Sequence, residues 1–396
     1  MKSTAEFDLI VYGASGFVGR LIAEHLIHHK GATPIRWAMA GRDPAKLHAL
    51  RSNIGAQGVP IIVADSNDPT TLNTMAARTR AVLSATGPFA LYGGPVVAAC
   101  ARSGTDYLDV SGESVWTREM IDAHEIDAKA SGARIMPCCG YDSVPSDLGV
   151  WLVQQQARAI YGHPLSLVKG RVYDVQGSFS GGTAETVRYL MSAAGRDPAF
   201  LALLGDPFAL TPGFKGPLQP SPFEIRFDKD IGEWVAPFKM APLNIANVHR
   251  SNLLQKHAYG ADFVYDEMIV LRDCKDAAQA AEASARHGWS GLDMLAGDHV
   301  PQLGEGPSRE ERRAGFYNLV YLGIGDDGRQ VQIHISGDED AGYGSTAKIA
   351  AETARCLLID GASLPGGMWT PAPALGQRLV ERLTANAGLT FTVKIQ

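Results

Sequence analysis

The sequence predicts an α/β protein with an N-terminal doubly wound parallel sheet and a second, α+β domain built on a mixed sheet. Strands and helices alternate over roughly the first 150 residues, and a glycine-rich turn joins the first strand to the first helix. Hairpin signals replace this alternation further along the chain. We therefore expect domains at residues 1–150 and 151–340, with residues 341–396 supplying a helix and a strand that pack back on both.

The composition is that of an ordinary globular chain. Of its 396 residues, 45% are hydrophobic and 20% are charged, and the formal net charge is -6. Nucleic acid is not expected as a partner, because phosphate binding needs a clustered positive face. We find neither a signal-peptide pattern nor a run of about 18 apolar residues, so a cytoplasmic protein without a transmembrane helix is expected. Five cysteines in a long chain fit a reducing compartment.

The first predicted strand and helix enclose a G-x-x-G-x-x-G turn. Apolar residues 9–11 form a short strand, three glycines follow, and apolar residues then recur with a helical period. Such a turn lets the backbone approach a pyrophosphate at the free N–H groups of a helix N-terminus. An ordinary tight turn is the alternative explanation. The residues expected to contact a dinucleotide here are Gly13, Ser15, Gly16, Phe17, Val18 and Gly19.

The ends of the next three predicted strands extend this cofactor site. Arg42 follows the second strand, where a site for NAD would place an acid, and its guanidinium suits a 2′-phosphate. The next two residues, 43–44, are better explained as the cap and first residue of a helix. We therefore predict NADP rather than NAD as the cofactor. The residues expected to contact it at these strand ends are Arg42, Asp65, Thr86, Gly87 and Pro88.

The stretch "MPCCGYDSVPSDLG", residues 136–149, lies at the end of the sixth predicted strand, where ligands bind in open α/β sheets. Its two adjacent cysteines would point to opposite faces of a strand, so no metal is expected. Residues 143–147 contain the capping serine, proline and acid that are typical of a helix start. Tyr141 and Asp142 lie in the bend itself, and we expect Asp142 to orient a partner group at the site.

The second half of the chain reads as a mixed sheet with helices. A strand over residues 165–176 leads into "FSGGT", residues 179–183, and then into a helix. Residues 205–247 are rich in proline and aromatics and predict an irregular cover over the site. The remaining predicted elements are a strand at 260–273, a hairpin at 316–337 with an Asp-Asp-Gly turn, an amphipathic helix at 342–361 and a final strand at 388–396.

Several motifs together resemble the saccharopine dehydrogenase-like oxidoreductases, and most closely the branch of trans-acting enoyl reductases. The resemblance covers nearly the whole chain. The motifs that carry it are "YGASGFVG", "MAGR", "TGPFALYGGPVVAACARSGTDYLDVSGE", "CGYDSVPSD", "FSGGT", "MAPLN", "RSNLL" and "DAGYGSTAKIAAETA".

This resemblance implies an NADP-binding Rossmann domain and a substrate domain on a mixed sheet. It also implies reduction of a carbon–carbon double bond in a polyketide-derived lipid, on an intermediate bound to a carrier and supplied in trans. Relatives often carry a markedly apolar stretch before the last hairpin. The matching residues 276–297 are only mildly apolar, so no more than weak peripheral membrane association is expected.

Enoyl reduction needs hydrogen-bond donors for an enolate oxygen and a proton for the α-carbon. The backbone N–H groups of residues 181–182 and the hydroxyls of Ser180 and Thr183 are candidate donors, although "SGGT" also fits a simple capped turn. Tyr92 and Tyr141 are the candidate proton donors. Packing with a satisfied hydroxyl is the commoner role of a tyrosine.

Two other functions stay open at this stage. An amino-acid oxidoreductase of the saccharopine dehydrogenase type would need several cations around a dicarboxylate, for which Arg171, Arg188 and Arg250 are candidates. A non-catalytic sensor or scaffold would bind NADP without turning over a substrate. A small-molecule or carrier-bound substrate is the expected partner, and the sequence leaves the oligomeric state open.

Overall fold

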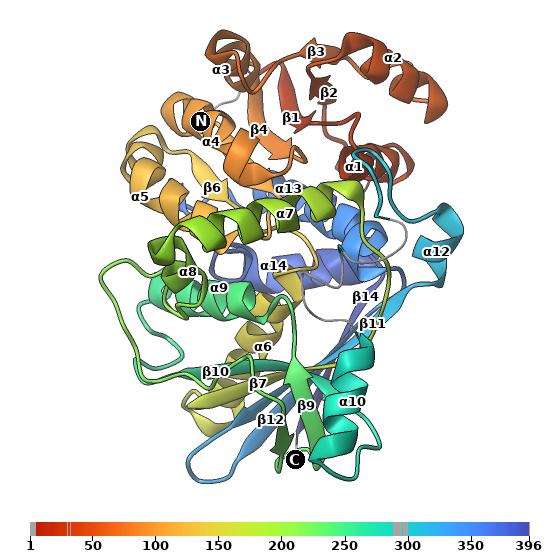
Figure 1. The fold of residues 1–396 in the computed structure, drawn as a ribbon. Helices are drawn as coiled ribbons and strands as arrows, with labels where there is room; N and C mark the ends of the chain where they lie inside the picture. Colours follow the sequence, from red (N-terminus) through yellow and green to blue (C-terminus); the bar gives the residue numbers. More distant parts are fainter. Residues whose placement is uncertain (1–4, 30, 32, 288–294, 296–299, 396) are drawn as a thin grey trace.

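The computed structural model describes residues 5–29, 31, 33–287, 295 and 300–395. It contains two seven-stranded sheets, drawn at opposite ends of the molecule in Figure 1. The fold is therefore α/β with a parallel sheet and a second mixed sheet, as predicted. None of the described helices has both the length and the apolar character needed to cross a membrane.

The first sheet is parallel throughout, and helices cover both of its faces. Its strands in spatial order are β13 (Gly367–Met368), β6 (Arg134–Met136), β5 (Asp106–Asp109), β4 (Thr79–Ser84), β1 (Phe7–Tyr12), β2 (Trp37–Gly41) and β3 (Ile61–Val63). Alternate residues of β1 enter different apolar cores, which is why residues 9–11 of the strand are an unbroken apolar run.

Three helices lie on each face of this sheet. One face is covered by α1 (Phe17–His28), α2 (Pro44–Asn53) and α13 (Thr346–Ile359), and the other by α3 (Pro69–Ala77), α4 (Phe89–Ser103) and α5 (Ser114–Ser131). The predicted start of α2 is confirmed, since Asp43 accepts a hydrogen bond from the Lys46 N–H at 3.1 Å and Pro44 is the first helical residue.

The second sheet is mixed, and only its β7–β10 pair is parallel among the described pairings. Its strands in spatial order are β14 (Leu389–Ile395), β12 (Gln330–Gly337), β11 (Phe316–Ile324), β7 (Leu167–Gln176), β10 (Val264–Leu271), β9 (Glu233–Pro237) and β8 (Arg226–Asp228). One face packs against α6 (Val144–Tyr161), α9 (Ala241–Leu254) and α14 (Pro371–Asn386).

The prediction that residues 205–247 form an irregular segment is wrong from residue 226 onward. Residues 226–228 and 233–237 form β8 and β9, which pair with each other and extend the sheet from β10. Residues from Ala241 onward form α9, where Pro242 lies in the first turn, a position that proline favours. The two strands have only 3 and 5 residues, which is too short for a period of alternating residues to show in the sequence.

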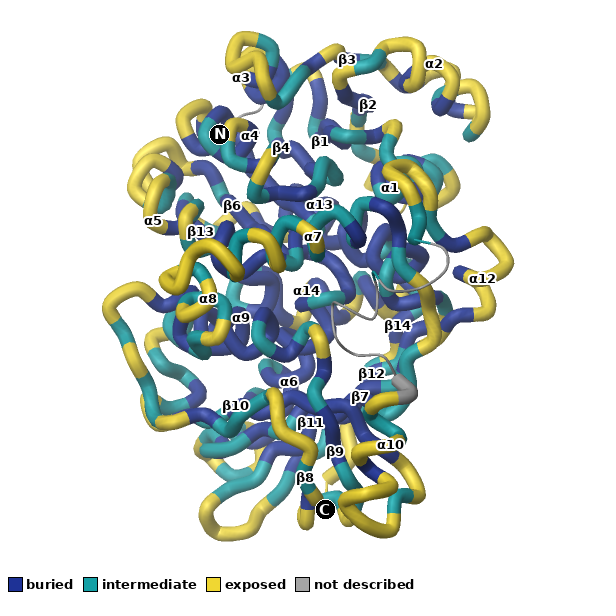
Figure 2. The backbone as a smooth tube through the Cα atoms, viewed as in Figure 1, coloured by how far each residue is buried: buried dark blue, intermediate teal, exposed yellow. Residues whose placement is uncertain are grey.

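The remaining helices lie between or beside the sheets. Figure 1 shows α7 (Gly181–Arg196) crossing the molecule between the two sheets, and Figure 2 shows that it is only partly buried. The others are α8 (Pro198–Leu204), α10 (Ala277–His287), α12 (Arg309–Ala314) and a π-helical turn, η1 (Ala341–Ser345). The mildly apolar stretch at 276–297 includes α10, but residues 288–294 and 296–297 lie outside the described part.

Candidate active site

The turn after β1 has the geometry that its glycines predict. Gly13 has a φ of +79°, and a Cβ there would lie 2.3 Å from the Thr86 hydroxyl oxygen. A Cβ on Gly19 would lie 2.2 Å from the Gly13 carbonyl oxygen, so only glycine lets α1 lie this close to the turn. Gly16 has ordinary backbone angles, and a Cβ there would meet only the Gly13 oxygen, at 3.2 Å.

The N-terminus of α1 leaves several donors free. Gly16 is its N-cap and has no side chain to cap the helix. The N–H groups of residues 17–19 have no hydrogen-bond partner within the described chain. The Thr86 hydroxyl nearby is buried and also lacks a partner there. An anion such as a phosphate would satisfy such N–H groups.

Arg42, Asp65 and Tyr12 share the edge of the sheet beside this turn. Burial raises the pKa of Tyr12, Asp65 raises it further, and Arg42 lowers it, which puts both charges near the phenol. Arg42 is exposed and forms no ion pair with any described residue. Asp65 accepts hydrogen bonds from the Asn67 N–H at 2.9 Å and from its amide at 3.2 Å.

A buried acid that sequence reasoning missed caps α4. Glu113 accepts hydrogen bonds from the N–H groups of Phe89 at 2.8 Å and Ala90 at 2.9 Å, directly after the predicted Thr86–Pro88 loop. Burial raises the pKa of this carboxyl group, while both N–H groups lower it. Tyr92 lies just beyond, half-buried on α4, and no hydrogen bond links it to the other candidate donors.

Tyr343 brings the predicted second-domain residues together, and sequence reasoning missed it as well. Its hydroxyl accepts a hydrogen bond from the Ser180 N–H at 2.5 Å and lies 2.6 Å from the Thr183 hydroxyl. Its ring meets the Phe17 ring edge-on, with centroids 5.2 Å apart. Tyr343 therefore connects the start of α7 to the start of α1.

The turn η1 holds Tyr343 in this position. Asp340 accepts hydrogen bonds from the N–H groups of Tyr343 at 2.9 Å and Gly344 at 2.8 Å. A π-helical turn often marks a functional site. The only sequence signal was a tyrosine between two glycines in "DAGYGST".

The predicted pair of backbone donors at "SGGT" is reduced to one. The Gly181 N–H donates to the Glu305 carbonyl at 3.1 Å, and a Cβ on Gly181 would lie 1.9 Å from the Gln302 oxygen. The Gly182 N–H has no partner within the described chain, and a Cβ on Gly182 would meet only the Ser180 hydroxyl oxygen, at 3.6 Å. Ser180 caps α7 by accepting from the Thr183 N–H at 3.4 Å, so the capped-turn interpretation is also right.

Asp142 faces the start of α9 across the turn after β5. A Cβ placed on Gly112 would lie 3.4 Å from the Met240 methyl and 3.7 Å from an Asp142 carboxylate oxygen. Burial raises the pKa of Asp142 and Lys239 lowers it. Conversely, burial lowers the pKa of Lys239 and Asp142 raises it. Asp142 also raises the pKa of Tyr343, after the larger effect of burial.

The rest of the bend joins α6 to α9. Ser143 is the N-cap of α6, but its hydroxyl does not cap the helix, so the predicted cap is wrong. It instead accepts from the Asn247 amide at 2.8 Å and donates to the Asn244 oxygen at 3.3 Å. Asp147 accepts from the Ser251 hydroxyl at 2.5 Å, and burial raises its pKa to about 7.

Tyr141 is buried and has an unpaired hydroxyl. Its ring lies 4.6 Å from that of Tyr317, and its oxygen has no partner within the described chain. Burial raises the pKa of Tyr141 well above its usual value. None of the five cysteines forms a disulfide, and no cluster of metal-ligating side chains occurs among the described residues.

Comparison with known proteins places this geometry in a family. Residues 9–136 match the family described as "Saccharopine dehydrogenase NADP binding domain". The chain is 37% identical to a "Trans-acting enoyl reductase" of Mycobacterium tuberculosis, over 98% of each chain. It is 36% identical to one of Mycobacterium ulcerans, over 96% of each.

The chain belongs to the saccharopine dehydrogenase-like family, in the branch of the trans-acting enoyl reductases. It is thus an NADP-dependent oxidoreductase, as the sequence motifs predict. A saccharopine dehydrogenase from Saccharomyces cerevisiae has the same fold, with a TM-score of 0.57 and 13% identity over 98% of this chain and all of the other.

The residues at the first sheet fit NADP, the cofactor of this family. Free N–H groups at the start of α1 and the unpaired Thr86 hydroxyl offer hydrogen bonds to phosphate oxygens. Arg42 offers a guanidinium that no described carboxylate neutralises. These three features lie at the carboxyl end of the sheet, where ligands bind in such folds.

The three arginines considered for a dicarboxylate do not form a site in this family member. Arg171 is buried and paired with Asp228 at 2.6 Å and Asp266 at 2.5 Å. Arg250 is paired with Glu125 at 3.2 Å, and Arg188 lies on the surface of α7. The structure does not bring them together.

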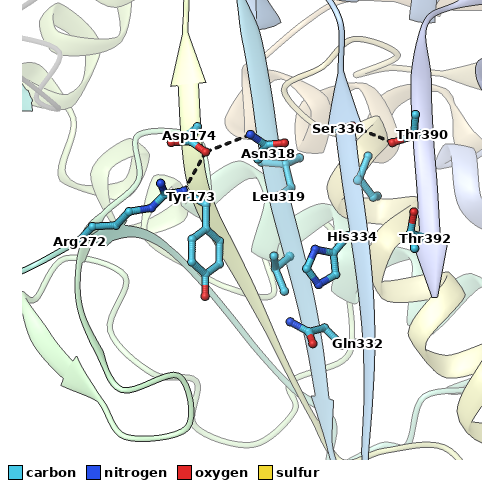
Figure 3. A pocket seen from close by; sticks show the side chains of 12 residues that line it. Tyr173, Asp174, Arg272, Asn318, Leu319, Gln332, His334, Ser336, Thr390 and Thr392 are labelled. Carbon is cyan, nitrogen blue, oxygen red and sulfur yellow. Dashed lines mark hydrogen bonds and ion pairs between the residues drawn. The ribbon is translucent and has the colours of Figure 1, made fainter. Parts of the chain in front are cut away.

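A separate hollow of about 500 Å³ lies on the second sheet (Figure 3), and it contains none of the predicted site residues. Its polar groups largely pair with one another. Asp174 accepts from Arg272 at 2.8 Å and Asn318 at 3.0 Å, and Ser336 lies 2.7 Å from Thr390. Because none of the predicted site residues lines this hollow, the candidate active site stays the region around Tyr343, Asp142 and the carboxyl end of the first sheet.

Proposed function

We propose that this protein reduces the carbon–carbon double bond of an α,β-unsaturated thioester, using NADPH. The substrate is a lipid or polyketide-derived chain bound to a carrier. The names of the mycobacterial relatives support this proposal, and one observation about the site carries it. Asp142, Tyr343 and the start of α7 converge on the carboxyl end of the first sheet, without the arginines that a dicarboxylate needs.

The first domain would hold the cofactor. Bound NADPH supplies the hydride. The N–H groups at the start of α1 would bind the pyrophosphate, and Arg42 the 2′-phosphate. The remaining contacts that we propose come from Gly13, Ser15, Gly16, Phe17, Val18, Gly19, Asp65, Thr86, Gly87 and Pro88.

The second domain would hold the reacting part of the substrate. The Gly182 N–H is free to donate to a carbonyl oxygen, and such a donor stabilises charge that develops there. Tyr343 fixes Ser180 and Thr183, so the hydroxyl of Thr183 has a defined position. Tyr141 is buried against Tyr317, and Tyr92 stands apart on α4, so neither is favoured as the proton donor.

Stopped-flow oxidation of bound NADPH tests this function against its alternatives. We expect an enoyl thioester to oxidise NADPH, and saccharopine or an imine to leave the redox state unchanged. Turnover of the amino-acid substrates alone would favour a saccharopine dehydrogenase-type activity. No turnover with either class would favour a sensor or scaffold.

The cofactor preference is tested at Arg42. We expect Arg42→Ala to weaken NADPH at least tenfold, about 1.4 kcal/mol, and to leave NADH nearly unchanged, because only NADPH carries the 2′-phosphate. The measurement is a fluorescence titration with each cofactor. Arg51→Ala, at a half-buried arginine of α2 that pairs with His48, is the matched control. Equal losses for both cofactors would remove the proposed role of Arg42.

We further propose that the substrate is delivered by a carrier domain of a separate synthase, in the cytoplasm. The absence of a disulfide among the five cysteines fits a reducing compartment. Any membrane contact would be weak and peripheral.

A further inference from the structure

We propose that Arg312 and Arg20, together with the free N–H groups at the start of α1, form a site for the diphosphate group of the cofactor. This site goes beyond the glycine-rich turn, because Arg312 comes from α12, in the second half of the chain. It depends on cofactor binding alone and not on the enoyl reduction proposed above. No sequence motif had pointed to either arginine.

The Phe17 ring places both guanidinium groups beside the start of α1. Phe17 is the first residue of this helix. The central carbon of the Arg20 guanidinium lies 5.4 Å from the centre of the Phe17 ring, and that of Arg312 lies 5.7 Å from it. The segment before α12 packs on the same ring, since a Cβ on Gly306 would lie 2.7 Å from it, and Figure 1 shows this segment beside α1. Two cations therefore lie at the end of the helix whose N–H groups are free.

Arg312 is a buried charge without a counter-ion. Four arginines are buried among the described residues. Three of them, Arg171, Arg250 and Arg355, each pair with a carboxylate at 2.5 to 3.8 Å, whereas Arg312 forms no ion pair with a described residue. It donates from Nη1 to a neutral acceptor, the Pro307 carbonyl, at 2.7 Å. Because a buried charge is costly unless it is paired, an anionic ligand is the expected partner of Arg312.

The acidic groups that face Arg312 do not neutralise it by contact. Burial lowers the pKa of Arg312, Asp340, Glu24 and Glu339 raise it, and Arg20 lowers it further. None of the three acids forms an ion pair with Arg312. The Asp340 carboxylate is instead held by two N–H groups of η1, at 2.8 and 2.9 Å.

Arg20 also has unused hydrogen-bonding capacity. Its Nε is buried and has no partner within the described chain. The one ion pair that it forms with a described residue, to Glu24, is 3.9 Å long. Arg20 and Arg312 repel each other, and an anion bound between them would remove that repulsion. A diphosphate suits this place, because its oxygens accept paired hydrogen bonds from a guanidinium group and further bonds from the N–H groups of a helix N-terminus.

Titration of the full-length protein with NADPH and with NADH tests the site. Both cofactors carry the diphosphate, so we expect Arg312→Gln to weaken the two by equal factors, at least about tenfold. Arg312→Lys keeps the charge and should recover part of that loss. Arg20→Gln, at a half-exposed side chain, should weaken both cofactors by about threefold. Arg313→Gln, at the exposed neighbouring arginine of α12, is the matched control and should bind both as the wild type does.

The melting temperature without cofactor separates binding from a structural role. Loss of an unpaired buried charge costs little stability, so Arg312→Gln should melt close to the wild type. A variant that melts lower but binds both cofactors normally overturns the proposal.

The phosphates of a carrier arm are the other source of the same chemistry, and two substrates distinguish them. A loss confined to the KM of a coenzyme A thioester, with the phosphate-free N-acetylcysteamine thioester unaffected, would move the site to the substrate and overturn its assignment to the cofactor. A wild type that binds NADPH but reduces no enoyl thioester would overturn the proposed function and leave this site in place, since both titrations are measured without turnover.

Discussion

Two glycines determine the shape of the turn after β1. At Gly13 the left-handed backbone and the nearby Thr86 hydroxyl exclude a Cβ, and at Gly19 the carbonyl of Gly13 does so. The spacing of these glycines predicts the turn from the sequence, because the constraint is local. Tyr343 could not be found in that way, since its partners Ser180 and Thr183 lie about 160 residues away.

Two glycines of this turn should respond differently to the same substitution. Gly16→Val adds a side chain where the pyrophosphate is proposed to lie but meets only one protein atom, so we expect NADPH binding to be lost with the melting temperature nearly kept. Gly19→Val forces its Cβ against the Gly13 carbonyl and should destabilise the fold by roughly 1–3 kcal/mol or more. Thermal melts measure the stability of the two variants, and NADPH titrations measure their cofactor binding. Normal titration by Gly16→Val would refute the phosphate site.

At the scale of elements, the α6–α9 contact brings together three motifs through which the chain resembles its family. "CGYDSVPSD" supplies Ser143, Ser146 and Asp147, and "MAPLN" and "RSNLL" supply Asn244 and Ser251. The start of α6 could be predicted, because proline and acid are local signals. The role of the Ser143 hydroxyl could not, because its partners lie 101 and 104 residues away.

Ser143→Ala should destabilise the protein through this contact rather than through a helix cap. It leaves the buried Asn247 amide without its acceptor, which costs about 1–3 kcal/mol. Urea unfolding measures the loss. In an Asn247→Ala background the same substitution should cost much less, since the amide is already absent. Equal costs in both backgrounds would restore the capping explanation.

His249 on α9 should make the fold sensitive to acid. It lies buried between Phe208 and Phe263, and burial lowers its pKa to about 3. Because the folded pKa lies below the unfolded value of 6.5, the unfolded chain binds the extra proton between these values. The contribution of neutral His249 to the free energy of unfolding is therefore complete above about pH 6.5. It is lost progressively as the pH falls towards 3, by about 2 kcal/mol at pH 5.

His249→Phe tests this acid sensitivity. It removes the titration while it keeps an aromatic ring, so the difference in unfolding free energy between pH 7 and pH 5 should shrink by about 2 kcal/mol. His163→Phe, at an exposed histidine after α6, should leave that difference unchanged. An unaltered pH dependence in His249→Phe would show that His249 is not the group that titrates.

At the scale of the whole molecule, the C-terminal segment joins the two sheets. β13 extends the first sheet by pairing with β6, α13 covers its face, and β14 forms the edge of the second. The alternation that predicts the first sheet ends at β6, so its seventh strand had no sequence signal. Most strands of each sheet could be predicted from local pattern, whereas β8, β9, β13 and the arrangement that brings Tyr343 to the first sheet could not.

The hydroxyl of Tyr343 should determine how firmly the whole of α7 is attached to the rest of the fold. Only Gly181 and Ala184 of α7 are buried, so the bonds from Tyr343 to Ser180 and Thr183 carry much of its attachment. Tyr343→Phe keeps the ring on Phe17 and leaves the buried Ser180 N–H unpaired, which costs about 1–3 kcal/mol. We expect amide exchange in α7 to accelerate at least tenfold, and enoyl turnover to fall.

Tyr317→Phe, which removes a buried hydroxyl bonded to Ser345 at 2.8 Å, is the control and should leave exchange in α7 unchanged. If Tyr343→Phe instead accelerated exchange equally in α7 and in the strands of the second sheet, its hydroxyl would be a general stabiliser of the fold and not the attachment of α7.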